Sequence, residues 1–192
     1  MCRSISTMWF FSLGAIMKIK NHPGDLDEAL RIREQLLEIR EATLGSEHPD
    51  TLKAMVGLAT TLLALLRLGE ARQLEEKVLE IRIRNLGSEH PDTLSSMNNL
   101  AVTLKLLGDL DGARRMGEQV LATRERLNGA KDPGTTLSAW NLLSTVRKLG
   151  DGEAEAELIG KLRWLLDYDH DEIASVDQQS IRGMLLARLR HA

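Results

Sequence analysis

Apolar residues recur along this chain with the spacing of an amphipathic helix. In one segment they fall at i, i+3, i+4 and i+7, which puts them on one helical face. The four positions are Met55, Leu58, Ala59 and Leu62, and they return 42 residues later (97 − 55 = 42) as Met97, Leu100, Ala101 and Leu104. The pattern therefore predicts helices that bury one face and recur at a fixed interval.

A second apolar set shows the same interval three times. Its members are Ala29, Ala71 and Ala113, then Ile32, Leu74 and Met116, then Leu36, Val78 and Val120, and finally Leu37, Leu79 and Leu121. These positions predict the buried face of a second helix in each unit. The small residues Ala59 and Ala71, and likewise Ala101 and Ala113, are expected where paired helices cross.

The connection between units is repeated letter for letter. Residues 44–52 return as residues 86–94, an offset of 42 (94 − 52 = 42). Pro49 and Pro91 within them suit the first position of a helix, where the missing N–H has no partner to lose. Three glycines, expected to form left-handed helix caps, follow the second helices: Gly45, Gly87 and Gly129. A fixed period of this length is typical of a stacked helical array, in which each unit packs only against its neighbours.

A third unit is weaker. Its motif, residues 131–137, aligns through Leu137 at an offset of 43 (137 − 94 = 43), one residue out of phase. Core places are expected for Trp140, Leu143, Ser144 and Ala156, whereas Arg147 falls where an apolar residue is expected. No Gly/Ser-rich or Pro-rich linker divides the chain. We therefore predict one all-α domain of about nine helices: an incomplete first repeat (1–44), two repeats (45–86 and 87–128), a degenerate repeat (129–167) and a C-terminal capping helix (170–192).

Composition narrows the function. Net charge is −3 and the pI about 6, which gives no basic excess for nucleic acid or anionic membrane. The single cysteine, Cys2, rules out an internal disulfide and suits a reducing cytosol, so a cytoplasmic protein is expected. No apolar run reaches the length of a membrane span.

The N-terminus carries a dense aromatic cluster, Met8-Trp9-Phe10-Phe11. Its apolar run resembles a short signal-peptide core, but no small-x-small cleavage pattern follows. We expect this segment to fold back as the first helix and cap the stack. The alternative is that it mates with a second copy and forms a homodimer.

The repeated residues resemble the tetratricopeptide repeat in its 42-residue form, found in kinesin light chains and in many bacterial and fungal repeat sensors. Residues 93–101 are similar to the first helix of that family, and residues 108–113 to its turn and second helix. The resemblance covers about residues 25–166. It implies a right-handed α-solenoid whose first helices line a concave groove, where family members mostly bind peptides or other protein segments.

The resemblance also implies which residues face that groove. The predicted peptide-binding positions are Lys53, Thr60, Ser95, Asn98, Asn99, Val102, Lys105, Ser138, Asn141, Thr145 and Lys148. Asn98 and Asn141 align at equivalent places, and each amide could clamp a peptide backbone with its donor and acceptor. The alternative is that these amides are solvated or bond to the adjacent helix. Of the clamp that holds chaperone carboxylates only Asn99 is matched, so a chaperone-tail adaptor is not expected.

Other candidate sites have structural interpretations. Arg40, Arg82 and Arg124 follow the period, either as a basic ladder for an acidic ligand or, as we favour, as structural pairs with aspartates or helix ends. His48 and His90 are expected at helix starts and not as metal ligands. Residues 167–172 resemble a calcium loop but lack its glycine and its bidentate glutamate. No catalytic, metal or cofactor motif is recognised.

The sequence therefore predicts a non-catalytic scaffold that binds a protein or peptide segment without a cofactor. The alternatives are a ligand-sensing module of a signalling system and a structural oligomerisation block.

Overall fold

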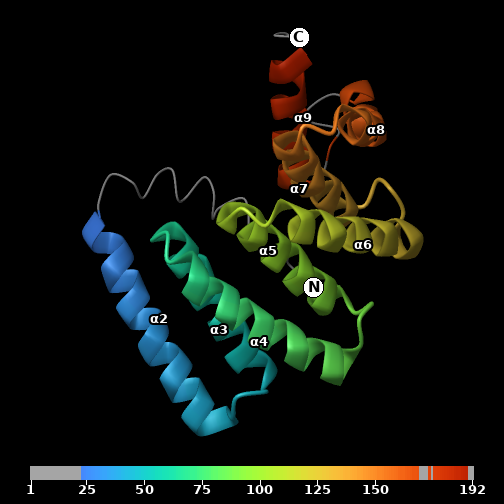
Figure 1. Cartoon of the computed structure of the whole chain (residues 1–192). Coiled ribbons are helices and arrows are strands. Elements are labelled where there is room, and N and C mark those ends of the chain that lie inside the picture. Colours follow the sequence, from blue (N-terminus) through green and yellow to red (C-terminus); the bar gives the residue numbers. More distant parts are fainter. Residues whose placement is uncertain (1–22, 169–172, 174, 190–192) are drawn as a thin grey trace. The chain divides into compact units, whose positions relative to one another are not determined.

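The computed structural model describes residues 23–168, 173 and 175–189, and these form helices joined by short turns (Figure 1). The α-helices are α2 (Pro23–Leu44), α3 (Pro49–Ala64), α4 (Leu68–Leu86), α5 (Pro91–Leu107), α6 (Leu110–Asn128), α7 (Pro133–Leu149), α8 (Gly152–Leu162) and α9 (Val176–Leu189), and a 3₁₀ helix, η1, spans Arg163–Asp167. The predicted all-α class is confirmed.

The helices fall into two compact units, one of α2–α5 (the first unit) and one of α6–α9 (the second unit). In the first unit α3 packs against α2 and α4, and α4 packs against α5. In the second unit α7 packs against α6, α8 and α9. Each helix thus contacts mainly its sequence neighbours, as expected for stacked helix–turn–helix repeats.

The third repeat is in phase with the others, so the predicted offset of 43 is wrong. α3, α5 and α7 begin at Pro49, Pro91 and Pro133, which are 42 residues apart in each case (91 − 49 = 42; 133 − 91 = 42). The alignment failed because Thr136 stands where Leu94 is expected, and Leu137 is one position further along. The proline, whose φ and missing N–H suit a helix start, marks the register more reliably than the leucine.

Each of these helices begins with a side-chain cap. The Nδ1 atoms of His48 and His90 accept hydrogen bonds from the backbone N–H groups of Asp50 (3.2 Å) and Asp92 (3.1 Å). In α7 the carboxylate of Asp132 accepts from the N–H of Thr135 at 3.0 Å. The prediction that the two histidines are satisfied helix-start residues is confirmed.

The glycine caps differ from the expectation. Gly87 and Gly129 have φ of 88° and 85° but ψ of 163° and 164°, an extended conformation at positive φ and not a left-handed cap. Left-handed caps instead end the first helices, at Gly108 (φ 90°, ψ 0°) and Gly150 (φ 75°, ψ 17°). Glycine is favoured at all four places because positive φ brings a Cβ against the backbone.

Leu66 occupies the equivalent place 42 residues before Gly108, with φ 60° and 78% of its surface exposed. A side chain in this region costs about 1 kcal/mol relative to glycine. We expect Leu66→Gly to stabilise the protein by up to about 1 kcal/mol, seen as a higher denaturation midpoint at unchanged m-value. Leu66→Ala keeps the Cβ and is the matched control. An equal gain in both variants would mean that backbone strain is not the cause.

The core of the first unit lies between α3 and α4. Ala59 and Ala71, 1% and 0% exposed, belong to one buried cluster with Leu58, Leu62 and Leu63. The small residues of this helix pair therefore pack together, as predicted.

Some predicted core positions are exposed. On α2, Ile32 and Leu36 are 52% and 39% exposed, because α2 packs mainly against α3 among the described helices. The N-terminal segment expected to cover them, with its aromatic cluster, lies outside the described residues. In the second unit Ala156 is exposed, and Arg147 reaches solvent, where it pairs with Glu155 at 3.2 Å.

Candidate functional site

The three periodic arginines are structural. Each donates from Nη1 to a backbone carbonyl in the first turn of the next helix: Arg40 to Asp50 (2.6 Å), Arg82 to Asp92 (2.8 Å) and Arg124 to Gly134 (2.7 Å). Arg82 and Arg124 also donate to Ser96 Oγ (2.8 Å) and Ser138 Oγ (2.9 Å). Burial lowers the pKa of both, but a guanidinium stays charged at neutral pH. The favoured structural interpretation is correct, although the partners are carbonyls and hydroxyls and not carboxylates.

In the first unit, α3 and α5 carry the predicted groove residues with different exposure. Lys53 is exposed and pairs with Asp50 at 2.9 Å. Thr60, Ser95, Val102 and Lys105 are half-buried, whereas Asn98 and Asn99 are 6% and 4% exposed. Lys53 and the four half-buried residues are the part of this set that offers side-chain surface in the structure.

In the second unit, the 42-residue register of α7 explains the exposure of the remaining predicted groove residues. Ser138 and Thr145 are 1% and 4% exposed, Asn141 is half-buried and Lys148 is exposed. Ser138 is the counterpart of Ser96 (96 + 42 = 138), and both accept from the preceding helix's buried arginine. It is therefore a packing residue of the helix interface.

The counterparts of the groove positions in α7 lie one residue earlier than predicted. Adding 42 to Ser95, Asn98, Val102 and Lys105 gives Leu137, Trp140, Ser144 and Arg147. The first three are half-buried and the last is exposed. Asn141 thus corresponds to Asn99, and the counterpart of Asn98 is Trp140. Trp140 was predicted to lie in the core and is half-buried; the 42-residue spacing of the prolines identifies its place in the repeat.

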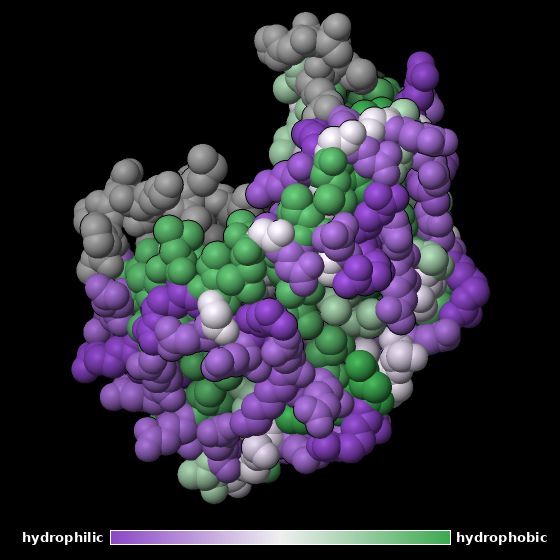
Figure 2. Space-filling view, in the orientation of Figure 1, coloured by the Kyte–Doolittle hydropathy of each residue, from purple (hydrophilic) through white to green (hydrophobic). Residues whose placement is uncertain are grey.

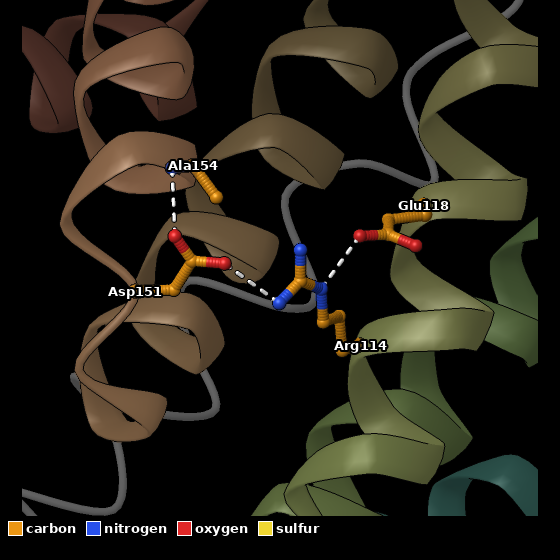
Figure 3. Close-up of polar contacts among 4 residues, drawn as sticks. All are labelled: Arg114, Glu118, Asp151 and Ala154. Atoms are coloured by element: carbon orange, nitrogen blue, oxygen red, sulfur yellow. Dashed lines mark hydrogen bonds and ion pairs between the residues drawn. The ribbon is translucent and has the colours of Figure 1, made fainter.

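The second unit also has a shallow cleft between α6 and α8, with Leu142 and Val146 of α7 among its lining residues. Ion pairs link α6 to the α8 region near both ends of this cleft. Arg114 bonds Glu118 at 2.7 Å and Asp151 at 2.8 Å (Figure 3), and Lys161 bonds Glu125 at 2.8 Å.

The carboxylate of Asp151 also caps α8. It accepts the N–H of Ala154 at 3.0 Å, and this bond, followed by Arg114, lowers the pKa of Asp151 (Figure 3). The charges around the cleft are thus engaged in joining α6 to α8.

The described residues offer neither a candidate metal site nor a candidate membrane span. Within the described ranges, no three His, Cys, Asp or Glu side chains gather as a metal site would require. Residues 169–172 of the calcium-like segment lie outside those ranges. None of the described helices has both the length and the apolar character needed to cross a bilayer. The visible face is mostly hydrophilic, with apolar patches between the charged residues (Figure 2).

Comparisons with known proteins agree with the helix–turn–helix repeats. Two tetratricopeptide-repeat family models match, one over residues 18–84 and one over residues 93–134. The chain belongs to the tetratricopeptide-repeat family. A search of curated proteins found no match.

Solved structures place the repeats among those of kinesin-light-chain type. A Podosopora anserina protein described as kinesin light chain with nearly identical TPR-like repeats is 26% identical, with a TM-score of 0.72. The match covers 92% of this chain and 82% of that chain, and a variant of the same protein gives a TM-score of 0.73. BtubC (BKLC) of P. vanneervenii is 26% identical over 72% of this chain and 55% of its own, with a TM-score of 0.65.

Proposed function

We propose that this tetratricopeptide-repeat protein is a non-catalytic scaffold that binds an extended segment of a partner protein on the inner face of its first helices. Support comes from comparing equivalent positions in successive repeats. Some packing positions recur unchanged, as in the buried Thr51, Thr93 and Thr135, which are 42 residues apart. Half-buried and nearby face positions vary instead: Val56, Asn98 and Trp140 are equivalent, as are Thr60, Val102 and Ser144. Variation at equivalent surface places, on a constant frame, is what recognition of a non-repetitive ligand requires.

In the first unit we propose Lys53, Thr60, Ser95, Val102 and Lys105 as the contact surface. They combine two amines, two hydroxyls and one apolar side chain, which suits a peptide read by mixed contacts. Asn98 and Asn99 border this row and would contribute after a small opening. Of the α7 residues, Asn141 and Lys148 remain proposed contacts, together with Trp140.

The alternatives have weaker support. The exposed Ile32, Leu36 and Ile39 of α2 form an apolar row that fits either the predicted N-terminal cap or a homodimer through it. A ligand-sensing role has no specific observation in its favour. The single cysteine suits the reducing cytoplasm, which we propose as the location.

Peptides selected from a display library on the full chain give the test. For a selected peptide, Val102→Arg is expected to raise the dissociation constant at least tenfold, about 1.4 kcal/mol, because a long cation then fills the proposed surface. Fluorescence anisotropy measures the change, and thermal melting checks folding. The matched control is Gln73→Arg on the exposed side of α4. Thr60→Arg serves if the first variant unfolds.

Affinity that survives Val102→Arg and Thr60→Arg but is lost in Gln73→Arg would move the binding surface to the second helices and overturn the proposal.

A further inference from the structure

A carboxyl group lies buried between α4 and α5 in the first unit. Glu75, on α4, is 3% exposed, and its Oε2 atom has no hydrogen-bond partner in the described part of the chain. Across the interface Thr103 of α5 is fully buried, and its Oγ1 is likewise unpaired in that part of the chain. Two buried polar atoms without hydrogen-bond partners in the described residues thus lie at this helix interface.

The repeats show that this place does not need a carboxylate. The equivalent residues are Arg33 and Gly117 (75 − 42 = 33; 75 + 42 = 117). Arg33 donates to the carbonyl of Gly57 in the next helix, and a Cβ at Gly117 would lie 3.1 Å from Leu142. The same position is therefore bonded in one repeat and close-packed in another, and only the middle repeat carries an acid there.

No cation compensates this acid among the described residues near it. On α4, Arg72 pairs with Glu76, and Arg82 turns to Asp92 and Ser96 of α5. On α3, Lys53 pairs with Asp50 at the far end of the helix from the α3–α4 turn. Lys105, two residues after Thr103, is the nearest cation along α5 and has other interactions. Burial removes water from the carboxyl, and this largest effect raises the pKa of Glu75 to about 7. The side chain of Thr103 lowers that pKa, and the charge of Glu76 raises it.

We propose that Glu75 makes the interface between α4 and α5 a pH-sensitive joint of the array, tight while the carboxyl is protonated and loosened when it ionises. A neutral carboxyl can donate to a neighbouring oxygen such as Thr103 Oγ1, whereas a carboxylate there is a buried charge that no cation of the described residues neutralises. The sign follows from proton linkage. Because the folded state holds this proton more tightly than the unfolded state, the contribution of Glu75 to stability is greatest at acid pH and falls as the pH rises toward about 7. Above that pH the loss is complete. The behaviour needs no bound peptide.

The test compares the full chain with Glu75→Gln and with the matched control Glu76→Gln, which changes the exposed neighbour on the same helix. Between pH 6 and pH 8 the unfolding equilibrium constant of the parent is expected to rise about tenfold more than that of Glu75→Gln, since one pKa unit corresponds to a factor of ten. Glu76→Gln should keep most of the parent's response, because the charge of Glu76 raises the pKa of Glu75 less than burial does. The histidines are common to all three proteins and cancel in the comparison.

Two further measurements locate the effect. Carbon-13 NMR should show the Glu75 carboxyl titrating with a midpoint near 7, and hydrogen exchange, corrected for intrinsic rates, should speed up in α4 and α5 at pH 8. Glu75→Leu, which removes the charge without an amide, covers the case in which Glu75→Gln does not fold. A midpoint near the ordinary glutamate value, or the same pH response in the parent and in Glu75→Gln, would overturn the proposal.

Discussion

Replacing Ala71 by tryptophan is expected to destabilise the first unit by about 3 kcal/mol, at the upper part of the usual range for overpacking. Ala71 is fully buried on α4, and Ala59 of α3 lies in the same cluster at 1% exposure. Two alanines at a helix crossing let the helix axes approach closely, and an indole between them forces the axes apart. Since domains are stable by only about 5–15 kcal/mol, a loss of this size changes the folded population greatly.

Denaturant unfolding followed by circular dichroism measures the change. Ala42→Trp is the matched control, because Ala42 lies exposed on α2 and the same side chain there should shift stability by no more than about 0.5 kcal/mol. Ala71→Leu should fall between the two. If Ala71→Trp melts with the parent, the α3–α4 crossing is not as closely packed as the structure has it.

The repeat architecture was predictable from the sequence because its signals are local. Pro49 with His48, and Pro91 with His90, combine a helix start and its cap within two residues, and the 42-residue period gives their spacing. The buried face of α3 follows from the apolar positions, as in Met55, which is fully buried. Such features depend on residues close together in the chain, so they can be predicted from the sequence.

Features that depend on the partner helix were predicted less well. Nothing around Glu75 marks it as buried, because Glu76 and Lys77 beside it are exposed and charged. The arginine partners were misassigned for the same reason: the carbonyl of Asp92, and not its carboxylate, lies opposite Arg82. A carbonyl acceptor has no signature in the sequence.

For the candidate site, an error of one residue in the repeat register changed which α7 side chains were predicted to face the groove. An alignment through Leu137 placed Ser138 and Thr145 on the groove, and both are buried. The spacing of Pro91 and Pro133 instead makes Trp140 the counterpart of Asn98. A helix turns by about 100° per residue, so a shift of one position moves a side chain from the groove to the interface between helices.

Replacing a buried arginine is expected to cause the second large loss of stability. Arg82→Met is expected to destabilise the protein by about 3 kcal/mol, because two hydrogen bonds from a charged donor are lost at about 1.5 kcal/mol each. Methionine keeps much of the apolar stem, so the loss reports the guanidinium, which bonds the Asp92 carbonyl and Ser96 Oγ at 2.8 Å each. Arg82 joins the second helix of one repeat to the first turn of the next. Its loss therefore weakens the contact between α4 and α5.

Arg84→Met is the matched control two residues away on the same helix. Arg84 pairs with Glu47 at the surface, with about half of each side chain exposed, and such pairs contribute less than about 1 kcal/mol. Combining Arg82→Met with Ser96→Ala should cost less than the two single changes added, since both remove the same bond. Equal destabilisation by Arg82→Met and Arg84→Met, or strict additivity with Ser96→Ala, would show that the periodic arginines do not hold successive repeats together.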